Sequence, residues 1–158
     1  MQLTRFTDLS LRVLMYLARS DPQRTPVVTI AEIASQFEVP HNHLIKVVNK
    51  LGKLGWIAAQ RGRNGGLRIS IEPAQLRLGQ ALRELENRTD LVDCASINCR
   101  LDGQCLLRHA LDVGQQAMFS ALDQYTLADV VQNPTGNAIV SMHRLYLAQT
   151  PDKPGQLK

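Results

Sequence analysis

The sequence has little of several residue types, and each shortage narrows the class of protein. Aromatic side chains are scarce, with one Trp, three Tyr and three Phe among 158 residues, which suits helices packed through Leu, Val, Ile and Ala. No segment approaches the ~20 consecutive apolar residues of a membrane-spanning helix. The N-terminus is polar and amphipathic with no unbroken apolar run, so we expect no secretory signal and a cytoplasmic protein.

Motifs for catalysis are also lacking. The sequence shows no Ser-His-Asp arrangement with motif support and no paired carboxylates in an expected cleft. The glycine-rich stretch at residues 62–66 is not followed by a helix that starts with Lys-Ser or Lys-Thr, which argues against a nucleotide-binding loop. We therefore predict that the protein is not an enzyme. Failure to bind any DNA would reopen the alternative that it is one. The histidines are expected on the surface or on helix faces: His41, His43, His109 and His143.

Acidic residues are absent from one long segment. Between Glu38 and Glu72 the sequence has no Asp or Glu, although six Lys and Arg side chains fall there. Residues 1–72 hold ten Lys/Arg against five Asp/Glu, whereas residues 73–158 hold eight against nine. A stretch of one charge sign is usually a solvated face, but at this length it is typical of a surface that binds a polyanion.

Helical spacing in and before this segment predicts a helix-turn-helix. Thr29 and Glu32 have the spacing of a capping box, and the Val39-Pro40 pair ends the helix that they begin. A second helix follows, with an apolar stripe on its inner side and basic or amide side chains outside. Such pairs of helices also occur as pure scaffold, but the acid-free surface favours DNA binding. The inner stripe comprises Leu44, Val47, Val48, Leu51 and Leu54.

The segment after this helix predicts a β-hairpin. Residues 55–61 lead into a glycine-rich tip, and residues 67–71 alternate apolar and polar side chains. A hairpin that carries Arg61, Arg63 and Arg68 beside a recognition helix is a wing, and arginines at its tip suit a narrow minor groove. We therefore predict a mainly α fold, a winged helix-turn-helix with a long C-terminal dimerisation helix.

Spacing in the C-terminal half predicts a helix–helix contact. Six residues after position 105 step alternately by four and by three, as in a heptad-like seam. Packing within one domain would look similar, but a protein that reads a palindromic operator on double-stranded DNA needs two-fold symmetry, so we favour a homodimer. The seam comprises Leu107, Leu111, Gly114, Met118, Ala121 and Tyr125. The expected units are a DNA-binding domain (1–86), a loop (87–105), a dimerisation helix (106–133) and a C-terminal extension (134–158).

All three cysteines lie close together, at Cys94, Cys99 and Cys105. In a reducing cytoplasm, clustered thiols bind metal or do redox chemistry more often than they form disulfides. Three cysteines, an odd number, also cannot all pair within one chain. Zinc and an iron–sulfur cluster each need one more ligand. His109 shares a helix face with Cys105 and could complete a zinc site. The spacing alone leaves zinc, an iron–sulfur cluster and unmetallated thiols open.

Several motifs together resemble the nitric-oxide-sensing members of the Rrf family, which are bacterial iron–sulfur regulators with a winged helix. The resemblance covers residues 1–133 and rests on LTRFTD (3–8), RGRNGG (61–66), LVDC (91–94), YTLAD (125–129) and the two cysteine gaps. In a sister branch of the family, the first gap is one residue longer and a His ligand follows the last Cys by three residues. Here Arg108 holds that position and His109 is out of register.

The resemblance implies a function and a set of ligands. A 4Fe–4S cluster would be held by Cys94, Cys99 and Cys105 of one subunit and by Asp8 of the other, a residue that by itself suits a helix dipole. The protein would be a repressor that releases its operator when the cluster is nitrosylated. We expect the recognition helix to contact the major groove and the wing to contact the minor groove. The expected DNA contacts are His41, Asn42, Lys46, Asn49 and Lys50, with Arg61 and Arg63 on the wing.

Overall fold

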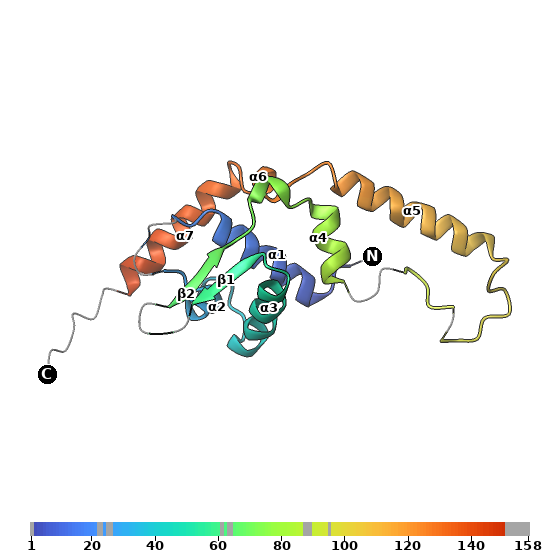
Figure 1. Ribbon diagram of the computed structural model, residues 1–158, viewed down its shortest axis with the longest axis horizontal. Coiled ribbons are helices and arrows are strands. Elements are labelled where there is room, and N and C mark those ends of the chain that lie inside the picture. Colours follow the sequence, from blue (N-terminus) through green and yellow to red (C-terminus); the bar gives the residue numbers. More distant parts are fainter. Residues whose placement is uncertain are drawn as a thin grey trace, which may run out of the picture.

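Helices dominate the fold and surround one small hairpin (Figure 1). The computed structural model describes residues 2–21, 24, 27–60, 62, 65–86, 90–94 and 96–150. This architecture confirms the mainly α fold expected from the sequence. The elements are α1 (Arg5–Ala18), α2 (Ile30–Gln36), α3 (His41–Lys53), β1 (Ile57–Gln60), β2 (Gly66–Ile69), η1 (Pro73–Gln75), α4 (Leu78–Leu85), α5 (Leu106–Leu122), α6 (Leu127–Val130) and α7 (Thr135–Gln149).

The N-terminal helices form the core of the head, the unit of residues 1–86 that the sequence predicts to bind DNA. α1 and α2 both pack against α3, whose inner stripe is buried as the spacing predicted. Only four residues separate α2 from α3, and Glu38 has a left-handed backbone (φ 51°) that makes this turn tight. The confirmed arrangement is a helix-turn-helix with α3 as its second helix. The buried residues of α3 are Leu44, Val47, Val48 and Leu51.

The wing packs edge-on against the segment before α2. β1 and β2 are antiparallel, with Ile57 opposite Ile69 and Gln60 opposite Gly66. The Leu67 N–H donates to the Val28 carbonyl at 2.7 Å, which fixes the hairpin to the head. A Cβ at Gly66 would meet the Val28 carbonyl oxygen at 2.6 Å, so only glycine allows this close approach.

The first helix begins at Arg5, directly after a capping threonine. Thr4 is the N-cap, and its hydroxyl accepts the Thr7 N–H at 3.2 Å. Thr7 has the residue type of an N-cap as well, but it lies inside α1 and is fully buried. Asp8 lies in the first turn as expected. Across the described ranges, no helix combines the length and the apolar character needed to cross a membrane.

Helix α5 packs against the head only near the C-terminal end of the helix. Phe119 is the one buried residue of this helix, and the Arg83 guanidinium lies over its ring at 5.2 Å. Arg83 also pairs with Asp123 just beyond the helix, at 2.5 Å. The rest of α5 extends away from the head (Figure 1), and Leu106 at its start is 83% exposed. The segment predicted as one dimerisation helix (106–133) contains α5 and then α6.

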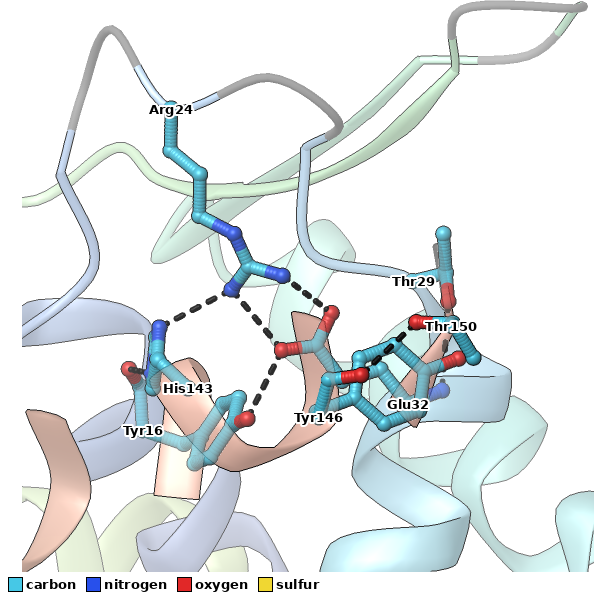
Figure 2. A network of polar contacts seen from close by, with 7 residues as sticks. All are labelled: Tyr16, Arg24, Thr29, Glu32, His143, Tyr146 and Thr150. Carbon is cyan, nitrogen blue, oxygen red and sulfur yellow. Dashed lines mark hydrogen bonds and ion pairs between the residues drawn. The ribbon is translucent and has the colours of Figure 1, made fainter. Parts of the chain in front are cut away.

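The C-terminal helix α7 returns to the head and joins a buried polar network, shown in Figure 2. Arg24 donates to both carboxylate oxygens of Glu32, at 2.8 and 2.7 Å, and Tyr16 donates to one of them at 2.7 Å. His143 of α7 stacks on the Tyr16 ring at 4.0 Å. His143 was expected on the surface or on a helix face; it lies on α7, but on a buried face, since it is 6% exposed.

The partners of His143 fix its protonation. Arginine can only donate, so Nδ1 accepts from Arg24 Nη1 at 2.9 Å. A carbonyl can only accept, so Nε2 carries the hydrogen and donates to the Tyr16 oxygen at 3.2 Å. The imidazole is thus neutral. Burial holds the pKa of His143 below its ordinary value of 6.5, the positive charge of Arg24 lowers it further, and Glu32 and Tyr16 oppose this.

A pH-dependent stability follows from this depressed pKa. The unfolded chain binds a proton at His143 near pH 6.5, whereas the folded chain resists it, so the free energy of unfolding falls as pH decreases below that value. Urea unfolding between about pH 7.5 and 5.5 measures the slope. His143→Gln should remove part of this slope, and an unchanged slope in the variant would contradict the assignment.

Candidate DNA-binding face and cysteine loop

The outer face of α3 presents the side chains that the sequence assigned to DNA. His41, Asn42, Lys46 and Asn49 are exposed, and Lys50 is partly buried. They lie opposite the buried stripe, and α3 contains no acidic residue. Such a helix can place donors against base edges and phosphates of a major groove. The structure thus brings these five side chains to one surface.

Two more features of this face were not predicted. Ile45 is exposed between the polar side chains of α3, and an apolar side chain there suits a thymine methyl group. Arg5 of α1 lies in a groove of about 200 Å³ together with His43 and Lys46 of α3. The clustering of cations was invisible in sequence because Arg5 is about 40 positions away from its neighbours. The wing arginines Arg61 and Arg63 lie outside the described residues.

The cysteine loop is a succession of turns. The Cys99 N–H donates to the Cys94 carbonyl at 3.1 Å, and the His109 N–H donates to the Cys105 carbonyl at 3.2 Å. Among the described residues of the loop, Asn98 (φ 47°) and Gly103 (φ 84°) have left-handed backbones. All three thiols are free and partly exposed. The loop therefore presents three sulfur atoms without a disulfide.

The electrostatics of the loop link the cysteines to one another. Partial burial raises the pKa of the Cys94 thiol, the Cys99 thiol acts in the same direction, and the Arg108 guanidinium opposes them. Arg108 is held by Asp102 of the loop at 2.5 Å, which ties the loop to the first turns of α5. Three thiolates in this loop would repel one another, and a bound cationic centre would relieve that repulsion.

Asp8 lies on the solvent side of α1, apart from the cysteines of its own chain. Arg12 Nε donates to both Asp8 carboxylate oxygens at 3.0 Å, and both side chains are about half exposed. Arg12 was not singled out in the sequence, although its spacing of four residues is that of a helical ion pair. Among the described residues, no group of three His, Cys, Asp or Glu lies close enough to hold a metal ion.

Sequence comparison decides the family. The model of a family described as Rrf2, iron-dependent transcriptional regulator, matches residues 3–133. The chain belongs to the Rrf2 family. It is also 40% identical over 136 residues to the HTH-type transcriptional regulator NsrR of Bacillus licheniformis, covering 84% of this chain and 94% of that protein. The chain is thus a transcriptional regulator of the Rrf2 family that is similar to NsrR over most of its length.

Solved structures show the same fold. CymR of B. subtilis, described as the global cysteine regulator, has a TM-score of 0.66 at 21% identity and covers 82% of this chain and 95% of its own. IscR of T. potens has a TM-score of 0.65 at 20% identity, covering 83% and 86%. The Rrf2 match ends at residue 133, so α7 (Thr135–Gln149) lies entirely beyond it.

Proposed function

We propose that this Rrf2 regulator is a homodimeric, cytoplasmic repressor that binds a palindromic operator and senses nitric oxide. Cys94, Cys99 and Cys105 of one subunit and Asp8 of the other would hold a 4Fe–4S cluster. The 40% identity to an NsrR supports this function. The observation that carries it is the position of Asp8 on α1, the helix that also packs against α3.

The donor set suits such a cluster. Three free, partly exposed thiols in one run of turns provide the thiolate ligands that iron–sulfur clusters prefer. A carboxylate is a harder donor than a thiolate, so Asp8 would be the weakest of the four ligands. When bound, the cluster would supply iron atoms that react with nitric oxide. Within one chain Asp8 pairs with Arg12, so binding to the other subunit's iron would require the carboxylate to leave this pair.

The first two turns of α1 can carry the signal to DNA. Asp8 points to solvent on one side, whereas Phe6 and Leu9 line the groove that contains His43 and Lys46 of α3. Detachment of Asp8 from the other subunit would free α1 to shift, and α3 would shift with it. A dimer on two half-sites tolerates little change in the spacing or tilt of its recognition helices, so the operator would be released.

Anaerobic purification tests this function. A brown protein with iron and sulfide in equal amounts is expected, and nitric oxide added without air should weaken operator binding at least about 100-fold, toward the non-specific level. The apo-protein treated with the same gas is the control for direct modification of the chain. A colourless protein would favour structural zinc, with His109 as fourth ligand, or a thiol redox switch. Unchanged operator affinity of the brown protein after nitric oxide would reject the sensing function.

A further inference from the structure

An open apolar groove runs between α1 and the C-terminal helix α7. Its volume is about 410 Å³, and its floor and walls are mostly aliphatic, sulfur-containing and aromatic side chains. Its polar lining residues are Asp8 and Arg12 of α1, which form one rim, and Thr135 of α7. The groove is thus an apolar surface that begins at the carboxylate proposed as the fourth ligand. The apolar residues that line it are Leu11, Met15, Phe37, Ala138, Ile139 and Met142.

The subunit's own cysteine loop does not cover this groove. The residues that line it come from α1, the end of α2 and α7. Figure 1 shows the cysteine loop at the far end of α5, on the opposite side of the molecule from α7. The chain's own cysteine loop is therefore not the occupant of the groove.

The cysteine loop carries apolar side chains that are exposed to solvent in a single chain. Ile97 is 72% exposed and Leu101 is 63% exposed, both between the proposed ligands, and Leu106 directly follows the last cysteine. Large exposed apolar side chains gathered on one loop mark an interaction site more often than a solvated surface. The loop and the groove are complementary in character, since each presents an apolar surface beside the proposed ligands.

We propose that the groove of one subunit receives the cysteine loop of the other, so that α7 completes the cluster site across the dimer. This inference rests on the proposed function, because Asp8 can reach the other subunit's iron only if that loop lies at the rim of the groove. Ile97 and Leu101 of the partner subunit would then cover Met15 and Met142. The C-terminal extension thereby acquires a role in the sensor.

Charge at the rim supports the same occupant. Three thiolates and a carboxylate bring more negative charge than a 4Fe–4S core neutralises, so the docked loop is anionic at its centre. Arg12 lies beside Asp8 at the rim and would face that charge once Asp8 turns to iron. The apolar walls would also limit the access of water and chelators to the weak carboxylate bond.

A polar substitution in the groove tests the effect on the cluster. Met142→Gln keeps the length of the side chain but places an amide under the docked loop, whereas Ser141→Gln puts the same residue on an exposed neighbouring position. Loss of the visible absorbance is followed without air in excess chelator. Met142→Gln is expected to lose its cluster about tenfold faster than wild type, and Ser141→Gln at the wild-type rate. Equal rates in the two variants would count against docking.

Photo-crosslinking tests the contact itself. A benzophenone amino acid replaces Ala138 at the groove or, as the matched control, Ala148, another exposed alanine of α7. In dimers mixed from ¹⁴N and ¹⁵N chains, the probe at 138 should join the peptide around residues 96–106 of the other chain, and the probe at 148 should not. A crosslink within one chain, to another protein or to nothing would overturn the inference.

The two proposals fail in different ways. A colourless wild-type protein removes the cluster and the proposed function, while crosslinking still reports whether the loop docks. If the protein is brown and Asp8→Ala makes its cluster labile, the proposed function holds. In that case, equal decay of the two Gln variants together with no contact from position 138 rejects only the role of α7 in the site. The proposed function still stands.

Discussion

Asp8→Ala is expected to leave the apo-protein folded while it speeds cluster loss by about 10–100-fold, since even residues that only support a metal ligand have effects of that size. The Asp8 side chain is about half exposed, and Arg12, its ion-pair partner, lies one helical turn further along α1. Loss of this ion pair therefore costs only about 0.3–0.5 kcal/mol of folding free energy. Removal of one of four ligands, in contrast, opens an iron to solvent. Decay of the visible absorbance without air measures the rate, and urea unfolding of the apo-protein measures stability.

Arg12→Ala is the matched control for this prediction. It removes the same ion pair but keeps the carboxylate. Its cluster should decay much more slowly than that of Asp8→Ala, although faster than wild type if Arg12 compensates charge at the rim. If Asp8→Ala keeps both its cluster and its response to nitric oxide, the carboxylate is not a ligand.

Glu32→Ala is expected to lower the free energy of unfolding by about 3–5 kcal/mol, the usual cost of removing one partner from a buried ion pair. The carboxylate accepts two hydrogen bonds from Arg24 and one from Tyr16, all within 2.8 Å. Its loss leaves the buried guanidinium without a counter-charge. The Thr29 cap survives because it binds the backbone N–H of Glu32 at 3.1 Å. Denaturant unfolding measures the change.

A second variant separates the lost charge from the lost packing. Replacing Arg24 and Glu32 together by methionine removes both charges and keeps most of the volume, so its stability should lie much nearer to wild type than that of Glu32→Ala. A double variant that is as unstable as the single one would show that the packing of these side chains, rather than an unpaired charge, dominates the loss.

The local features of the fold could be predicted because their causes are local. The spacing of Leu44, Val47 and Leu51 defines a buried helix face without knowledge of what covers it. Glycines around position 62 and the alternation after it indicate a hairpin in the same way. A one-signed charge over these elements is likewise visible in the sequence, and the exposed face of α3 agrees with it.

The features that were missed depend on contacts between distant segments. Glu32 has the spacing of a capping box, yet its carboxylate turns inward to Arg24, because a buried guanidinium needs a counter-charge. Nothing near His143 in sequence shows that it stacks on Tyr16, which is 127 positions away. Thr4 and Thr7 are equally good caps by residue type, but Thr4 caps the helix in the structure and Thr7 is buried inside it.

The candidate site was predicted in its parts and not in its assembly. Spacing identifies Cys94, Cys99 and Cys105 as clustered thiols, and the resemblance adds Asp8. The structure of one chain does not bring these groups together, and a ligand from another subunit leaves no periodic pattern in sequence. The groove beside Asp8 was not predictable at all, because Met142 of α7 and Met15 of α1 meet only after folding.

Within a single chain, before any contact with another subunit, the attachment of α5 makes this helix a lever arm. The helix has 17 residues and is held at Phe119 and by the Arg83–Asp123 pair at one end, so with a rise of 1.5 Å per residue its free end lies about 25 Å from the joint. A tilt of only about 5° at that joint moves the far tip by about 2 Å, more than half the length of a hydrogen bond. A small rotation of α5 near α4 thus produces a large displacement at Cys105. Conversely, a displacement of the cysteines produces only a small rotation where α5 joins the head.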